Sequence, residues 1–441
     1  MAGFEAFLGE INDFLWGPPM LVLLCGTHLF LTFRLGIIQK HIPLGIRLSL
    51  SRSAKAPGDI SSFAALMTAL AATIGTGNIV GVATAVAAGG PGAVLWMWLT
   101  GVFGIATKYA EGLLAVKYRR TNAQGEMCGG PMYALEYGLK CRWLAVLFAA
   151  FCAIAAFGIG NMVQANSLAV LMQDTFHMPR LVTGCIITLM TGVVILGGIR
   201  SIARVCEALV PFMAIFYVLG CLYLLIVHLD RIPQTLNTIF SCAFTGHAAI
   251  GGFIGASMKD AVRYGVARGL FSNESGMGSA PIAAAAAKTT SPVEQALVSS
   301  TGTFWDTVVI CALTGLVIVS SGQWVDGLNG ASLTKAAFDE IPFVGPVILF
   351  VGLFTFVYST ILGWCYYGEK SIEYLFGVPA VKVYRAMWVV AVLLGSVLSL
   401  PLVWSFADCA NAMMAIPNLI SLLLLHKVIV RETRGYFKSR V

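Results

Sequence analysis

The residues best suited to chemistry form a run of small and polar side chains inside an otherwise apolar stretch. Residues 75–81 read Gly-Thr-Gly-Asn-Ile-Val-Gly. Each glycine costs a helix about 1 kcal/mol relative to alanine, so we expect the backbone to open here within the membrane. Opened N–H and C=O groups are tolerated in a bilayer only where they face protein or a wet cavity. The run therefore predicts a binding site for a small polar solute and an ion.

A second run of the same character lies in the other half of the chain. Residues 271–281 read Phe-Ser-Asn-Glu-Ser-Gly-Met-Gly-Ser-Ala-Pro. Glycines in membrane helices often serve close packing instead. Two breaks in matching places, each followed by an alanine-rich segment, nevertheless favour a transport site. The N-terminal ends of half-helices can hold a carboxylate, and their C-terminal carbonyls can hold a cation or an ammonium group.

The composition indicates a polytopic membrane protein. Of the 441 residues, 58% are hydrophobic and 11% are charged, and the mean hydropathy is +0.83. Residues 1–19 lack the basic region that begins a cleavable signal peptide. The eleven cysteines form no CxxC pair, and the six histidines have no metal-binding or catalytic spacing. We therefore expect neither disulfides nor a zinc site.

Hydrophobic runs predict the helices that must position the two breaks. We expect an all-α fold of about 11 transmembrane helices, with one leading span near residues 14–33 followed by ten core spans. The core spans are expected at 61–89, 92–116, 143–172, 181–199, 205–229, 248–287, 300–320, 345–367, 384–400 and 404–426. The sixth core span is too long for one helix, so a separate interfacial or re-entrant helix is expected at its start.

The distribution of basic residues predicts the orientation. The segments after the leading span and after the second core span, together with the C-terminal tail, are rich in Lys and Arg and fall on one side. The opposite loops contain only Arg180, Arg231 and Lys335. The positive-inside rule then places the N-terminus outside and the C-terminus in the cytoplasm of a cell-membrane protein. The net charge of +7 is spread over separate loops, so nucleic-acid binding is not indicated.

With this orientation, the core spans form two sets of five that cross the membrane in opposite senses, as in an inverted repeat. We expect four regions along the chain. They are an extra span and cytoplasmic loop at 1–60, a first five-helix repeat at 61–229, a second at 240–427, and a basic cytoplasmic tail at 428–441.

Several blocks of this sequence resemble the alanine or glycine:cation symporter family, the sodium:alanine symporters. The blocks are 75–98, 106–112, 115–119, 129–133, 162–167 and 268–281. Ser275 stands where the family pattern has alanine. The resemblance covers nearly the whole chain. It implies a LeuT-type core of ten helices with one extra N-terminal span, which takes up alanine or glycine together with Na+.

The resemblance also implies a substrate pocket. Its residues would be Thr76, Gly77, Asn78, Gln164, Phe271, Gly276, Thr360 and Trp364. Backbone N–H groups at the break and the Asn78 amide would hold the substrate carboxylate. The rings of Phe271 and Trp364 would leave room for little more than a methyl group, which favours glycine and alanine over branched amino acids. Nothing here decides between L- and D-alanine.

A sodium site next to this pocket is implied in the same way. Its ligands would be Ala71, Ile74, Phe356, Ser359 and Thr360. Three carbonyl groups and two hydroxyls are a suitable shell for a hard monovalent cation. Alternatively, the hydroxyls of Ser359 and Thr360 bond back to the preceding helical turn, as is common for membrane serines and threonines. No organic cofactor is expected.

Acidic residues at membrane depth require partners, because an unpaired charge there costs about 2.5 to 3.5 kcal/mol. They include Glu274, Asp306 and Asp408. We expect Glu274 to pair with Arg268 or with free N–H groups near the second break. Lys108 and Glu111 are three residues apart, so we expect them to pair with each other.

Three other functions stay open as alternatives. H+ could replace Na+ as the coupling ion, with Glu274 or Asp408 as the proton carrier. A passive channel would not explain two broken helices in an inverted repeat. An integral membrane enzyme would need a nucleophile with a base, or a cluster of metal ligands, and no such group lies at membrane depth in the sequence.

Overall fold

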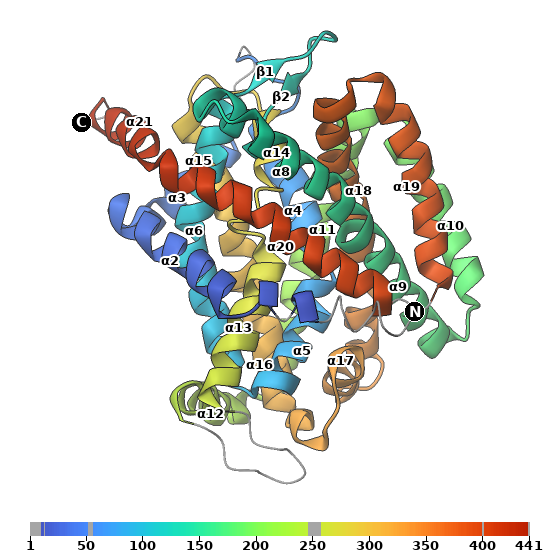
Figure 1. Cartoon of the computed structure of the whole chain (residues 1–441). Helices are drawn as coiled ribbons and strands as arrows, with labels where there is room; N and C mark the ends of the chain where they lie inside the picture. Colours follow the sequence, from blue (N-terminus) through green and yellow to red (C-terminus); the bar gives the residue numbers. More distant parts are fainter. Residues whose placement is uncertain (1–9, 13, 52–55, 246–256, 399–400, 440–441) are drawn as a thin grey trace.

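The computed structural model contains a bundle of helices with one short β-hairpin at one end (Figure 1). It describes the chain except residues 1–9, 13, 52–55, 246–256, 399–400 and 440–441, and it describes only the backbone of residues 401–407. The strands β1 (Arg120–Thr121) and β2 (Met127–Cys128) pair antiparallel in this hairpin.

The first half of the chain contains one leading helix and the predicted first set of spans. Its main helices are α2 (Pro18–Arg34), α3 (Ile42–Ser49), α4 (Ser62–Thr73), α5 (Val82–Gly89), α6 (Ala93–Lys117), α8 (Arg142–Ala155), α9 (Val163–Phe176), α10 (Arg180–Ile195) and α11 (Gly198–Val227). A π-helical segment at Ala156–Met162, a wide turn within the helix, joins α8 and α9 into one apolar span of 35 residues.

The second half repeats this pattern. Its main helices are α12 (Ile232–Phe244), α13 (Met258–Asn273), α14 (Pro281–Ala285), α15 (Pro292–Thr303), α16 (Ala312–Ser321), α17 (Gly330–Asp339), α18 (Val344–Phe376), α19 (Pro379–Val397), α20 (Pro401–Leu424) and α21 (His426–Lys438). A wide turn at Phe304–Cys311 joins α15 and α16 into one span of 30 residues.

Both predicted breaks are present. The first separates α4 from the helix at Gly77–Gly89, which includes α5, and the two axes differ by 54°. The second separates α13 from α14, and Gly276 and Gly278 adopt φ angles of +94° and +85° there. Only glycine reaches such angles without a steric penalty, so these two residues allow the chain to leave one helix and enter the next.

The two broken spans lie beside each other and run in opposite directions. At one end, Ile60 just before α4 bridges to Ala287 just after α14. At the other end, a Cβ on Gly89 would lie 2.9 Å from the carbonyl oxygen of Asp260, in the first turn of α13. The start of each broken span therefore lies at the end of the other, and the predicted all-α inverted-repeat fold is confirmed.

The number of spans agrees less closely with the sequence. In the described part of the chain, five helices are long and apolar enough to cross a membrane alone, and there are eight spans when each bent pair counts as one. Charges in the middle of α6 lower its hydropathy, and α10 has only 16 residues. A total of about 11 spans therefore stays a prediction.

Several predicted boundaries were wrong. The helix expected at 205–229 begins at Gly198, whose φ of +63° makes the turn after α10. The span expected from residue 300 begins at Pro292, because the Ser291 hydroxyl caps it by accepting the N–H of Glu294. The span expected to end at 367 continues to Phe376. Part of the separate helix expected within 248–287 falls outside the described residues.

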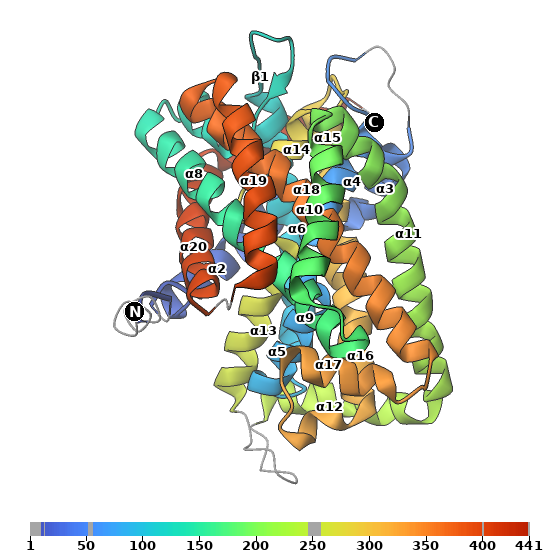
Figure 2. The same ribbon diagram turned by 90° about the vertical axis from the view of Figure 1, so that its right-hand side faces the viewer.

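Among the short helices that were not predicted are α12 and α17. Both lie at the end of the molecule opposite the β1–β2 hairpin (Figures 1 and 2). Each is a one-sided amphipathic helix rather than a span, so a search for long apolar runs passes over it.

Candidate transport site

The first break forms a tight turn against α18. The backbone N–H of Gly75 donates to Oδ1 of Asn78 at 2.9 Å, and the N–H of Asn78 donates to the carbonyl of Gly75 at 3.2 Å. A Cβ on Gly75 would lie 2.7 Å from Oγ1 of Thr360. Glycine is therefore needed here because α18 approaches the open backbone closely.

Four of the predicted sodium residues meet beside this turn. Thr360 Oγ1 lies 3.1 Å from the carbonyl oxygen of Ile74 and 2.8 Å from that of Phe356. Ser359 donates its hydroxyl to the same Phe356 carbonyl at 2.9 Å. The fifth residue, Ala71, is fully buried in α4. Both hydroxyls thus bond to the preceding turn of α18, and the Thr360 hydroxyl also reaches the Ile74 carbonyl.

The predicted substrate residues lie on several helices around the first break. Gln164 Oε1 accepts the N–H of Thr76 at 3.3 Å, and Gln164 Nε2 donates to the carbonyl of Ile159 at 3.0 Å, which the wide turn after α8 leaves accessible. A Cβ on Gly77 would lie 3.3 Å from Cδ1 of Phe271. The hydroxyl of Thr76 is buried and has no hydrogen-bond partner among the described residues.

Trp364 of α18 packs against the wide turn between α8 and α9. Its side chain packs so closely on Gly160 that a Cβ there would overlap the tryptophan, and the residue is 1% exposed. Trp364 lies one helical turn from Thr360. Both side chains therefore project from the same face of α18.

Asn78 is already engaged by the protein in this conformation. Its Oδ1 accepts from Gly75, and its Nδ2 donates to Oδ1 of Asp306 at 2.7 Å. A substrate carboxylate only accepts hydrogen bonds, so it could reach the Asn78 amide only by taking Nδ2–H from Asp306. The predicted role of the Asn78 side chain therefore requires a rearrangement, whereas the Thr76 hydroxyl is available as it stands.

Asp306 joins the two halves of the molecule, a role that the sequence did not reveal. Its carboxylate accepts from Asn78 in the first break, from Oγ of Ser272 at 2.9 Å and from Oγ1 of Thr307 at 2.7 Å. Ser272 and Thr307 were not among the predicted residues. In the sequence, only their positions could have indicated a role, because Ser272 directly precedes the second break and Thr307 directly follows Asp306.

The second break is held by Glu111, which corrects one prediction. Glu111 does not pair with Lys108. Its Oε1 instead accepts the N–H groups of Gly276 and Gly278, both at 3.0 Å, and Nδ2 of Asn418 at 2.7 Å. Buried N–H groups without partners are costly, so the free donors of the broken helix take the carboxylate.

Gly276 lies away from the first break. A Cβ on Gly276 would lie 2.7 Å from Leu24 of α2, and its next neighbour would be Leu419 of α20. The predicted substrate residues Thr76, Gly77, Gln164, Phe271 and Thr360 thus gather around one place, and Gly276 belongs to a different one.

The predicted partner of Glu274 also needs correction. Glu274 does not pair with Arg268, and it accepts a hydrogen bond from the hydroxyl of Ser279. Lys108 lies near enough to Glu274 to interact with it electrostatically. The Lys108 ammonium is buried and has no hydrogen-bond partner in the part of the chain that the structure describes.

The end of the molecule that carries the hairpin is closed by Arg119. Its guanidinium donates to the carbonyls of Ala285 and Ala287 after α14, at 3.0 and 2.7 Å. It also donates to Pro57 before α4 and to Thr289, at 3.0 and 2.8 Å. One side chain therefore ties the start of the first broken span to the end of the second.

The chain is similar in sequence to known proteins. The sequence profile of the sodium:alanine symporter family matches residues 1–441. The chain is 52% identical over 448 residues to the sodium/alanine symporter AgcS of Methanococcus maripaludis, covering 99% of this chain and 98% of that protein. It is 35% identical over 441 residues to the probable sodium/glutamine symporter GlnT of Bacillus subtilis, with coverage of 99% and 91%.

Solved structures of low sequence identity share the fold. The crystal structure of MhsT in complex with L-phenylalanine matches with a TM-score of 0.61 and 14% identity, covering 83% of this chain and 89% of that one. A substrate-bound, outward-open Na+-coupled sialic acid symporter matches with a TM-score of 0.55 and 10% identity, covering 87% and 82%. These similarities concern the arrangement of the helices.

Proposed function

Because the chain belongs to the sodium:alanine symporter family, we propose that its first break is where it couples the uptake of alanine and glycine to Na+. As a member of this family it is a membrane transporter and not an enzyme. The observation that carries the proposal is the meeting of Thr360 with the Ile74 carbonyl, because it joins the open end of α4 to α18 through oxygen atoms alone.

The sodium ion would bind between α4 and α18. Its ligands would be the carbonyls of Ala71, Ile74 and Phe356 and the hydroxyls of Ser359 and Thr360. In support, the Ile74 and Phe356 carbonyls already converge on a single hydroxyl. A cation there replaces weak hydroxyl donation with direct coordination. It would stabilise the contact between the two helices.

The substrate would bind next to this ion, across the break. The Thr76 hydroxyl, the N–H of Gly77 and the Gln164 side chain supply polar contacts, and the Phe271 and Trp364 rings limit the room for a side chain. Steric overlap must exclude larger amino acids, because one methylene group changes affinity by only about 1 to 3 kcal/mol. The Asn78 side chain would bind the carboxylate only if Asp306 released its Nδ2.

Transport would proceed by alternating access. We propose that the hairpin end, which Arg119 closes, faces the cytoplasm, with the N-terminus outside. Residues 61–229 and 240–427 would be the two repeats. Na+ would favour the state that accepts substrate from outside, and joint occupancy would then permit closure and release inside.

Uptake into proteoliposomes tests this function. We expect radiolabelled alanine to accumulate when Na+ is imposed outside, and not when choline replaces Na+. Excess unlabelled glycine should compete, and leucine should not. Equal accumulation in choline would overturn Na+ coupling. Accumulation driven by a pH gradient in Na+-free buffer would identify H+ as the coupling ion instead.

A further inference from the structure

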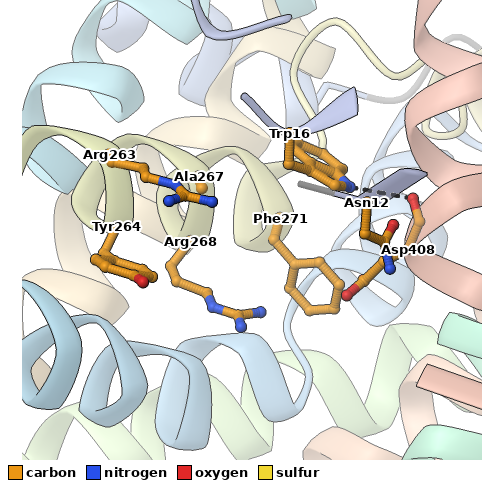
Figure 3. Close-up of a pocket in the computed structure, with 8 residues that line it drawn as sticks. All are labelled: Asn12, Trp16, Arg263, Tyr264, Ala267, Arg268, Phe271 and Asp408. Atoms are coloured by element: carbon orange, nitrogen blue, oxygen red, sulfur yellow. Dashed lines mark hydrogen bonds between the residues drawn. The ribbon is translucent and has the colours of Figure 1, made fainter. Parts of the chain in front are cut away.

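A pocket of about 200 Å³ lies beside α13, outside the first break. Arg268 and Phe271 reach it from α13, Asp408 from α20, and Trp16 from the segment before α2 (Figure 3). None of these side chains except Phe271 has a part in the transport site proposed above.

The pocket contains two opposite charges that do not form an ion pair with each other. Arg268 and Asp408 are near enough to interact electrostatically. No ion pair or hydrogen bond joins them within the described ranges of the chain, and the Arg268 guanidinium lies 5.9 Å from the centre of the Phe271 ring. In the view of Figure 3 the ring lies between the guanidinium and the carboxylate. Charges at membrane depth are costly, so a ligand that satisfies both signs would be favoured.

The backbone around the carboxylate is fixed. The indole N–H of Trp16 donates to the backbone carbonyl of Asp408 at 3.1 Å. This bond joins the segment before α2 to α20 and leaves the Asp408 carboxylate directed at the pocket (Figure 3). The carboxylate and the guanidinium thus come from separate helices, each held by its own packing.

Phe271 is the wall between this pocket and the first break. Its ring lines the pocket, and a Cβ on Gly77 would lie 3.3 Å from its Cδ1. This one side chain therefore lies against both places. A solute held at Arg268 and Asp408 would wait next to the transport site.

We propose that this pocket is an entrance site for a small zwitterionic amino acid. The carboxylate of the ligand pairs with Arg268, and its ammonium group pairs with Asp408. The volume admits alanine or glycine. The site needs no Na+, because both charges of the ligand find protein partners. This inference rests on the proposed function, since it supplies substrate to the site at the first break.

The direct test is to measure the weak binding of alanine in the absence of Na+. Saturation-transfer NMR in choline buffer should detect the alanine methyl group on the wild-type protein at about 10 mM ligand, which suits a millimolar dissociation constant. Glycine should compete, whereas propionate and ethylamine, which carry one charge each, should not. No signal on the wild-type protein would overturn the proposal.

Variants decide whether the signal comes from this pocket. Arg268→Gln and Asp408→Asn should each weaken Na+-free binding about tenfold or more, which corresponds to at least about 1.4 kcal/mol. Lys259→Gln removes a cation from the same helix outside the pocket and should leave the signal unchanged. Arg268→Lys keeps the charge and should retain part of the signal if the glutamine variant does not fold. Unchanged binding in folded Arg268→Gln and Asp408→Asn would overturn the proposal.

A variant in the transport site separates this proposal from the proposed function. Thr360→Ala should raise the Na+ concentration needed for half-maximal uptake and keep the Na+-free NMR signal. Loss of the signal in Thr360→Ala, with retention in Arg268→Gln, would place the observed binding at the first break and contradict an entrance site. Failure of Na+ coupling in the wild-type protein would leave the NMR result unaffected.

Discussion

Thr360 of α18 donates its hydroxyl towards the carbonyl of Ile74, 3.1 Å away, where α4 ends. This contact joins the end of α4 to a helix from the other half of the chain. It is made by a hydroxyl that also contacts the Phe356 carbonyl. Any cation bound here would replace the hydroxyl proton as the bridge between the two helices.

Removing these hydroxyls should weaken the use of Na+. We expect Thr360→Ala and Ser359→Ala each to raise the Na+ concentration for half-maximal alanine uptake by about tenfold, because each loses a ligand worth about 1 to 2 kcal/mol. Ser371→Ala is the matched control. Ser371 is a buried hydroxyl on the same helix that donates to Tyr367 at 2.9 Å, and it lies away from the break. Unchanged Na+ dependence in both site variants would remove them from the ion site.

Filling the space beside Gly75 should strongly reduce transport. In Gly75→Ala the new Cβ would lie 2.7 Å from Thr360 Oγ1, so we expect uptake to fall below about one tenth of the wild-type rate. Gly81→Ala is the control within the same run, since its Cβ would meet nothing closer than 3.9 Å, at the Thr76 carbonyl. Equal uptake by the two variants would contradict a close approach of α18. Surface expression should be measured for both.

The sequence predicted the breaks well because their cause is local. Glycines at residues 75–81 and at 276 and 278 weaken a helix wherever they stand. The sequence did not reveal what holds the breaks. Glu111 meets Gly276 across 165 positions, and Asn78 meets Asp306 across 228. Helical spacing indicated the nearby Lys108 as the partner of Glu111. The Glu111 carboxylate instead accepts the backbone N–H groups of the second break, which would be costly to bury without an acceptor.

For the stability of the folded protein, the negative charge of Glu111 should matter less than its side-chain oxygen as a hydrogen-bond acceptor. Glu111→Ala would leave two backbone N–H groups without an acceptor, at about 1 to 3 kcal/mol for each buried donor. Asn418 Nδ2 would keep only its bond to the Gly276 carbonyl. We expect a large fall in the thermal unfolding temperature of the detergent-solubilised protein. Glu111→Gln keeps an acceptor and should fall less. An alanine variant as stable as the glutamine variant would show that the second break does not depend on this side chain.

Arg119 should hold the hairpin end closed. Its guanidinium bonds to carbonyls on both sides of the contact between the start of α4 and the end of α14. The backbone N–H of Lys288 donates to Ile60 at 2.7 Å in this contact. Without the guanidinium, we expect Arg119→Ala to open this end more often, because several charge-assisted hydrogen bonds are lost together.

Hydrogen–deuterium exchange measures that opening. Peptides covering residues 57–61 and 285–290 should exchange faster in Arg119→Ala than in the wild-type protein, and Na+-driven alanine accumulation should fall because a leaking inner end cannot hold a gradient. Arg120→Ala is the control, since the neighbouring Arg120 is exposed and lies 4.6 Å from the centre of the Tyr137 ring. Its removal should change neither peptide. Equal protection in the two variants would mean that the rest of this end keeps it closed without Arg119.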